Sequence, residues 1–244
     1  MRIHQQPAFL LHARPWSETS LLVDMFTREY GRFRLMAKGA RRRKTGQRAI
    51  LQPFQPLSIS WSGKRSLMTL TGVEASHYYP RLSARNQASA YYMSELLFKF
   101  LHANDAHERL FESYAEALDG LRGTQPAEAI LRRFECHLLS EIGYGLQLEC
   151  DVVNRTPIRA DARYHYHPEK GPVEALDVHH EEAVSVSGHT LLALASRCFE
   201  TEQSQRESKF LLRSLLLRQI RSVRGSKGED FNTRAVYAQM LKIQ

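Results

Sequence analysis

Cysteine is scarce in this sequence. Among 244 residues there are three cysteines, Cys136, Cys150 and Cys198. An odd number without any Cys-x-x-Cys pair argues against a disulfide framework and against a zinc site of the thiolate type, and it fits a reducing cytosol. Cys136 and Cys198 lie in apolar helical patterns, so we expect both to be small core residues.

Long apolar runs and catalytic motifs are also missing. No apolar run reaches the ~18 residues of a membrane-spanning helix. The opening MRIHQQPAFLLHARPW lacks the apolar segment and cleavage site of a secretion signal. There is no GxxxxGK[ST], no GxGxxG after a strand, no GxSxG and no HExxH. We therefore expect a cytoplasmic protein that is not an enzyme and needs no cofactor or metal.

Positive charge is present in excess and is unevenly distributed. Lys and Arg number 34 against 26 Asp and Glu, a net charge of +8. Residues 1–80 carry 13 basic against 4 acidic residues, residues 81–205 carry 12 against 19, and residues 206–244 carry 9 against 3. Two basic segments thus flank an acidic one. Segregated positive charge predicts a polyanionic partner, because each neutralised phosphate releases condensed counterions.

The first third of the chain has the pattern of short strands. Residues 57 to 62 alternate between apolar side chains and serines, which is typical of a half-buried strand. Five strands in about 70 residues fit a small closed barrel such as the OB-fold, and an SH3-like barrel is the nearest alternative. The expected strands are Ala8–Ala13, Thr19–Thr27, Arg32–Lys38, Leu57–Ser62 and Ser66–Val73.

After Pro80 the apolar period changes from two to about 3.6, which indicates helices. The fold class is therefore α+β and multidomain. We expect an OB-fold domain over 1–80, a helical domain over 81–145 and 187–244, and an inserted β or irregular module over 146–186. The expected helices are 84–102, 107–122, one from about 124 to 143, 188–199 with Ser187 as its cap, 205–223 and 233–241.

The strongest candidate site is the third strand and the loop after it. Alternation places Arg32, Arg34, Met36 and Lys38 on one face, with about 7 Å between successive positions, a spacing close to the phosphate repeat of an extended single strand. The alternative is a solvated charged edge that prevents strand aggregation. The candidate nucleic-acid-binding residues are Arg14, Arg32, Arg34, Lys38, Arg41, Arg42, Arg43, Lys44 and Arg48.

Aromatic side chains could add stacking to this charge, because unpaired bases stack on them. Trp61 alternates with Ile59 and Leu57, which favours a core position. Trp16 follows a proline in a polar loop, and its role stays open. Tyr30 borders the basic strand and is a stacking candidate.

Two further groups are less specific. Arg132 and Arg133 lie on a helix with apolar neighbours, and they could grip a carboxylate-ended peptide or pair with local acids. His165 and His167 share one strand face, but no Cys or acidic residue stands at a diagnostic spacing. We therefore expect no metal ligands there.

Several segments resemble the RecO family of bacterial recombination mediators. They are HARPWSETSLLVDMFTREYGRFRLMAKGARR, then ILQPFQPL, the helix ending in SELL, and LRRFECHLLSEIGYG. The likeness is strong over the first ~80 residues and around 131–145, and loose over 146–186 and the last forty residues.

The resemblance implies a function. Such proteins bind single- and double-stranded DNA, anneal complementary strands, and help to load recombinase onto DNA coated by single-stranded-DNA-binding protein, together with RecR. It places DNA contacts on the basic strand and loop from Arg32 to Lys44, and contact with the acidic C-terminal tail of single-stranded-DNA-binding protein on Arg132 and Arg133. Many relatives hold zinc with four cysteines in the inserted module. Here only Cys150 lies in that region, so a hairpin around Tyr164 and Tyr166 would have to hold the module instead.

Two other functions remain as alternatives. An OB-fold can bind RNA, so an RNA-binding protein without catalytic activity is the second hypothesis. The third is a metal-dependent nuclease that uses residues 165 to 180, although no carboxylate cluster for two metals is visible.

Overall fold

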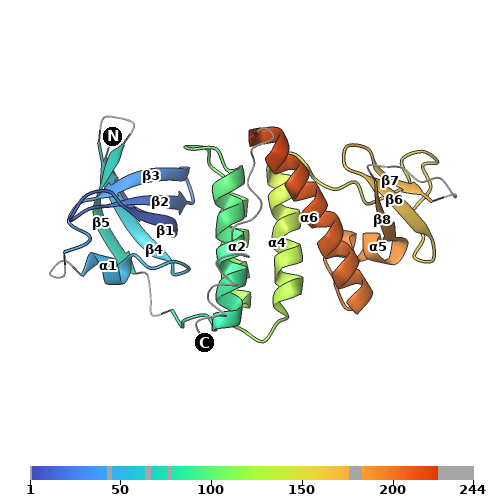
Figure 1. The fold of residues 1–244 in the computed structure, drawn as a ribbon, viewed down its shortest axis with the longest axis horizontal. Coiled ribbons are helices and arrows are strands. Elements are labelled where there is room, and N and C mark those ends of the chain that lie inside the picture. The colour runs from blue at the N-terminus through green and yellow to red at the C-terminus, as the bar shows by residue number, and fades with distance from the viewer. Residues whose placement is uncertain (1, 43–45, 64–66, 76–78, 176–182, 225–244) are drawn as a thin grey trace. The chain divides into compact units, whose positions relative to one another are not determined.

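The structure, a computed structural model, describes residues 2–42, 46–63, 67–75, 79–175 and 183–224. Its contacts divide the chain into two compact units, with the boundary in sequence between Thr124 and Gln125. The first unit begins with five strands and a short helix (Figure 1). These are β1 (Arg2–Pro15), β2 (Leu21–Thr27), β3 (Gly31–Ala37), α1 (Gln47–Ile50), β4 (Leu57–Ser62) and β5 (Met68–Ala75).

The five strands close into a barrel, because each of them pairs with two others. β2 pairs antiparallel with β1 and β3, and β4 pairs antiparallel with β1 and β5. A short parallel pairing of β3 with β5 completes the circle, with Leu35 opposite Met68 and Met36 opposite Thr69. The strand order β1-β2-β3-β5-β4 is that of an OB-fold. The predicted fold class is therefore confirmed, and the SH3-like alternative is not needed.

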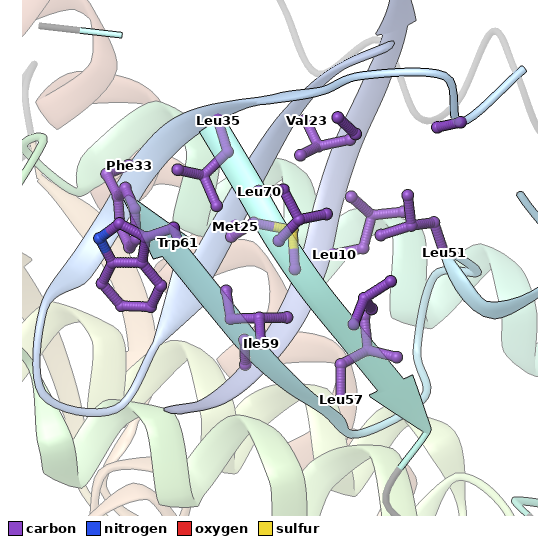
Figure 2. Close-up of a cluster of buried hydrophobic side chains, with 14 residues drawn as sticks. Leu10, Val23, Met25, Phe33, Leu35, Leu51, Leu57, Ile59, Trp61 and Leu70 are labelled. Atoms are coloured by element: carbon purple, nitrogen blue, oxygen red, sulfur yellow. The ribbon is translucent and has the colours of Figure 1, made fainter. Parts of the chain in front are cut away.

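The barrel core comes from the alternating strands that the sequence indicated. Along β4, Leu57, Ile59 and Trp61 are buried and the intervening serines are partly exposed. β3 contributes Phe33 and Leu35 to the same cluster (Figure 2). Trp61 is only 1% exposed, so its predicted core position is confirmed.

Two helices of the first unit pack on the outside of the barrel. They are α2 (Ala84–Phe100) and α3 (Glu108–Gly120). Phe9 of β1 and Phe26 of β2 both lie against Phe111 and Tyr114 of α3, with ring centroids 5.1 to 6.4 Å apart. The Tyr114 hydroxyl hydrogen-bonds Ser94 of α2 at 2.7 Å, which satisfies both buried groups. The helical hairpin formed by α2 and α3 thus packs against an apolar face of the barrel on β1 and β2.

The turn between β2 and β3 lies against the segment that follows α2. The Asn104 amide donates to the carbonyl of Arg32 at 2.8 Å. Gly31 has a φ of +65°, and a Cβ there would collide with the carbonyl of Asp105. Glycine is therefore required at this turn both for its backbone conformation and for the close approach.

The described residues of the second unit combine helices with a small sheet (Figure 1). α4 and α6 pack against each other, and α6 also contacts α5 and β8. The sheet has the order β7-β6-β8, so the predicted hairpin gains a third strand that the sequence analysis missed. The elements are α4 (Ala127–Glu141), β6 (Arg163–His167), β7 (Gly171–Glu174), β8 (Val184–Ser187), α5 (Gly188–Ser196) and α6 (Glu202–Arg224).

Buried polar side chains organise the sheet of the second unit. Asp151, which is 0% exposed, accepts hydrogen bonds from the amides of Val153, Asn154 and Glu174 at 2.5 to 2.7 Å. The Tyr164 hydroxyl accepts from the Arg159 amide, and the Tyr166 hydroxyl accepts from the Gln147 amide, both at 3.0 Å. Side-chain hydrogen bonds therefore tie the loops to the strands in this module.

Candidate nucleic-acid interface

Two arginines on the outward face of β3 share one carboxylate of β2. Asp24 lies opposite Arg34 in the strand pairing. Arg34 donates from Nε to Asp24 Oδ1 at 2.9 Å and from Nη2 to Oδ2 at 3.3 Å. Arg32 Nη1 lies 3.8 Å from the same Oδ1, and His12 Nδ1 lies 3.8 Å from Oδ2. Positive charge therefore converges on a carboxylate whose side chain is 2% exposed.

The surroundings of Asp24 keep it ionised. Burial alone would raise the pKa of this carboxyl group, because a charged form loses its hydration. Hydrogen bonds from His12 and Arg34, together with the charges of Arg34 and Arg32, outweigh burial and lower the pKa. Asp24 is thus a permanent counter-charge for the two arginines at neutral pH.

The end of α2 covers Arg32. Its Nε donates to the carbonyl of Leu101 at 3.1 Å, and its guanidinium carbon lies 4.9 Å from the centroid of the Phe98 ring. The Arg32 side chain is 17% exposed, against 39% for Arg34, whereas Lys38 is exposed. The predicted alternation of β3 is confirmed, but the expected row of three solvent-facing cations is not formed.

The reason for that difference is electrostatic. An arginine beneath a helix end requires a partner for its charge, and Asp24 supplies it. The alternation of β3 alone gives no indication that Asp24 of β2 lies on the same outward face. A DNA contact by Arg32 or Arg34 stays a prediction.

Two loops at one end of the barrel are joined through Arg41. Its amide donates to the carbonyl of Thr19 at 3.0 Å, and its Nη1 donates to the carbonyl of Ser17 at 2.6 Å. The β1–β2 loop is itself closed by a bond from the Trp16 amide to the Ser20 carbonyl at 3.1 Å. The β3–α1 loop, which turns at Gly39 with a φ of +72°, is thereby fixed against the β1–β2 loop.

These loops line a shallow groove of about 510 Å³. Its walls combine Trp16, which is 55% exposed, with Met36, Lys38 and Arg42. An exposed indole beside two cations is the combination that binds single-stranded nucleic acid, because bases stack on the ring and phosphates meet the charges. We call this the Trp16 groove. It is completed by Ser17, Thr19, Ser20 and Gly39.

The groove assigns a position to Trp16 that sequence reasoning left open. A tryptophan after Pro15 in a polar loop carries no periodicity, so its orientation cannot be read from its neighbours. The one indication in the sequence is that the residues two positions before and after Trp16 are polar, so Trp16 does not continue the apolar face of a strand. Tyr30, the other stacking candidate, instead packs edge-on against Trp61, with centroids 5.3 Å apart.

The remaining predicted cations lie in several places. Arg14, at the end of β1, and Arg48, on α1, are exposed, and neither forms an ion pair with any residue that the structure describes. Arg41 and Arg42 are exposed on the loop itself. Arg43 and Lys44 lie outside the described residues.

Arg132 and Arg133 point in different directions from α4. Arg132 is 5% exposed and donates from Nη2 to Oε1 of the buried Glu135 at 2.8 Å. Its Nε and Nη1 are buried with no hydrogen-bond partner among the described residues. Arg133 is half-buried and donates to Gln125 at 2.7 Å. The local acid pair was the alternative interpretation for this motif, and for Arg132 the structure contains that pair.

The cysteines and histidines were only partly predicted. Cys136 is buried as expected, whereas Cys198 is exposed, because α5 ends at Ser196 before reaching it. His165 and His167 share a face of β6, opposite to the buried tyrosines. In the part of the chain that the structure describes, no three His, Cys, Asp or Glu side chains gather as metal ligands, and no helix is both long and apolar enough to cross a bilayer.

Comparison with known proteins gives consistent matches along the chain. Residues 1–79 match the family model described as recombination protein O N terminal, and residues 81–227 match recombination protein O C terminal. A protein of Nitrosococcus oceani named DNA repair protein RecO is 46% identical over 216 residues, covering 88% of this chain and 87% of its own. A protein of the same name from Azoarcus sp. is 39% identical over 245 residues, covering 99% and 98%.

Proposed function

Because the chain belongs to the RecO family of DNA repair proteins, we propose that it is a non-catalytic mediator of DNA repair and recombination. In this proposal it binds single- and double-stranded DNA, anneals complementary strands, and works with RecR to load recombinase onto strands coated by single-stranded-DNA-binding protein. Its place would be the cytoplasm, at the nucleoid. The observation that carries the proposal is the Trp16 groove.

The groove combines two kinds of contact that unpaired DNA needs. Lys38, Arg41 and Arg42 lie within one loop region and offer charge to successive phosphates. Trp16 offers a ring on which a base can stack, a contact of about 1–3 kcal/mol. Arg14 and Arg48 extend the positive surface from β1 and α1. Arg32 and Arg34 contribute less in this proposal, because Asp24 already neutralises part of their charge.

Strand annealing follows from charge neutralisation. Two complementary strands repel each other through their phosphates until counterions or basic side chains reduce that repulsion. A basic barrel surface lowers the repulsion where the strands meet and leaves their bases free to pair. No bond is made or broken, so positioned charges are sufficient for the reaction.

The test is the salt dependence of DNA binding. Replacing Lys38, Arg41 and Arg42 together by alanine should flatten the slope of log K against log salt by about 2, at ~0.7 per single-strand phosphate. The control replaces three exposed cations elsewhere, Arg109, Arg155 and Lys170, and should change the slope little. An unchanged slope for the loop variant would reject the Trp16 groove as the contact site. Preference for RNA over DNA of equal sequence would favour the RNA-binding alternative.

The same proposal includes capture of an acidic peptide through Arg132 and Arg133. Supporting this, Arg133 is only half-buried on α4, and Arg132 has two donor nitrogens without partners among the described residues. Both nitrogens are buried, so in this proposal the Arg132 side chain turns outward before a peptide carboxylate accepts from them. The test uses a synthetic tail peptide of single-stranded-DNA-binding protein with Arg132→Lys and Arg133→Ala. Arg132→Lys keeps the charge beside Glu135 but loses the planar fork, so peptide affinity should fall while the fold stays intact. Unchanged affinity in both variants would reject this site.

A further inference from the structure

The helix α6 has a basic outer face with an aromatic residue at its centre. Leu211, Leu212 and Leu216 are fully buried, and α6 contacts α4, α5 and β8 (Figure 1). The outward side chains lie within about 100° of the helix circumference, from 3.6 residues per turn. They are Arg206, Lys209 and Phe210, which are exposed, and Arg213, which is half-buried, and we call these four residues the α6 patch.

The three cations of the α6 patch have no ion-pair partner among the described residues. The acids nearby are occupied or lie at the edge of the patch. Glu207 turns inward and accepts hydrogen bonds from the Ser187 amide and from the Ser187 and Thr190 hydroxyls at 2.7 to 2.9 Å. Glu202 stands one turn before Arg206, at the beginning of the helix. The positive charge of the patch is therefore not balanced within its own helix.

Phe210 gives the patch an apolar surface that a purely solvated helix face would not need. Its side chain is 65% exposed, the largest exposed fraction among the phenylalanines and tryptophans of the described residues. A single exposed apolar side chain is ordinary on a protein surface. Here, however, it lies between Lys209 and Arg213, one turn from Arg206. An aromatic ring flanked by unpaired cations is the arrangement on which unpaired bases stack.

We propose that the α6 patch is a second nucleic-acid-binding surface, which takes a single strand independently of the Trp16 groove. Arg206 to Arg213 extends about 10 Å along the helix, and the exposed Arg221 lies about 22 Å from Arg206, at ~1.5 Å per residue. The stripe is thus long enough to meet several phosphates in succession. This goes beyond the proposed function, because it gives one chain two places for DNA, one in each compact unit.

The experiment counts bound strands on the full-length protein. A labelled oligothymidylate of about 10 nucleotides is titrated at low salt, and the number bound per chain is measured by native mass spectrometry. The wild type should bind two. The triple variant Arg206→Ala, Lys209→Ala and Arg213→Ala should bind one, and Phe210→Ala should weaken the second binding event about 10-fold. The loop variant at Lys38, Arg41 and Arg42 should also bind one.

The control variant at Arg109, Arg155 and Lys170 removes the same charge from scattered exposed positions, and it should still bind two. The proposal fails if the triple α6 variant, folded by circular dichroism, still binds two oligonucleotides, or if the control loses one as well. It also fails if the triple α6 variant still binds two oligonucleotides but no longer binds an acidic peptide that contains an aromatic residue, because the patch would then bind a protein partner. If only the loop variant lost a bound oligonucleotide, the proposed function would stand, and the α6 patch would be rejected as a second site.

Discussion

At the scale of single residues, one tryptophan lies in the barrel core and the other in the candidate nucleic-acid interface. Trp61 is 1% exposed inside the barrel, and Trp16 is 55% exposed at its rim. A buried indole contributes to folding through the area it removes from water. An exposed indole contributes to folding little, so its energetic role has to come from a ligand. Substitution at these two positions should therefore separate stability from binding.

Trp16→Ala should weaken binding of a single strand about 10-fold and leave the thermal midpoint unchanged, because the lost contact is a stacked base. Trp61→Ala should destabilise the protein by about 3–5 kcal/mol, since it empties the barrel core. Anisotropy with labelled oligonucleotide and thermal unfolding provide the two readouts. In Trp61→Phe, the remaining tryptophan fluorescence should be quenched when DNA is added. No quenching would place the bases away from Trp16.

Asp24 gives the opposite case, a charged residue whose role is structural. Asp24→Asn should lower the free energy of unfolding by about 2 kcal/mol, because Arg34 and Arg32 lose a charged acceptor. Arg34→Ala should likewise reduce stability, and it should reduce DNA affinity less than Lys38→Ala does. Denaturant unfolding and anisotropy on the same variants check this. If Arg34→Ala weakened DNA binding as much as Lys38→Ala without a loss of stability, the arginine would be a direct contact.

At the scale of elements, alternation and helical periodicity were sufficient for most of the fold. They predicted the five barrel strands and every helix of the described residues longer than one turn. They missed β8, because this strand is only four residues long and ends at Ser187, the residue that caps α5. They also missed the first residues of β1, because the polar side chains there form no alternating apolar pattern. The Trp16 groove could not be predicted, because two loops meet there through hydrogen bonds to backbone atoms, which leave no trace in side-chain periodicity.

The junction between β8, α5 and α6 depends on one carboxylate. Burial raises the pKa of Glu207, but hydrogen bonds from Ser187, Thr190 and Gln203 outweigh it and lower the pKa from 4.5 to about 2. Because the pKa of Glu207 is lower in the folded protein than in the unfolded chain, its ionised form stabilises the protein at pH values above about 4.5. This stabilisation is lost as the pH falls from 4.5 towards 2.

Glu207→Gln should therefore reduce the free energy of unfolding by about 2 kcal/mol at neutral pH. The difference between wild type and variant should shrink between pH 4.5 and about 2. Urea unfolding at several pH values measures it. A difference that is constant over this range would mean that the charge of Glu207 does not act at the junction.

The small sheet of the second unit is a further element whose support lies in side chains. Asp151 holds three backbone amides, and its pKa is lowered by the amides of Asn154, Glu174 and Val153 against the effect of burial, which raises it. Asp151→Ala should destabilise the second unit by about 2 kcal/mol, because buried donors lose their acceptor. A metal chelator added to the wild type should leave its unfolding curve unchanged. A chelator-sensitive curve would indicate that a bound metal supports this module.

At the scale of the whole molecule, the barrel and α6, which both carry basic residues, belong to different compact units. The basic N-terminal segment forms the barrel in the first unit, and the basic face of α6 lies in the second. The acidic middle of the sequence separates them along the chain. The predicted division into residues 1–80, 81–145 with 187–244, and 146–186 stays a prediction. A chain with two compact units need not unfold in one cooperative step, and each unit can be followed by its own probe.

Both tryptophans lie in the first unit, so tryptophan fluorescence reports on that unit, whereas α4, α5 and α6 dominate the helical signal of the second. An oligonucleotide at about 100 times its Kd stabilises the unit that binds it by ~2.7 kcal/mol. If both the Trp16 groove and the α6 patch bind, the fluorescence transition and the circular-dichroism transition should both move to higher temperature. Because α2 and α3 belong to the first unit, the fluorescence transition and their share of the circular-dichroism transition should move in the triple α6 variant, and the remaining helical signal should not. If the wild type behaved like that variant, DNA would be held by the barrel alone, and the basic face of α6 would have to serve another partner.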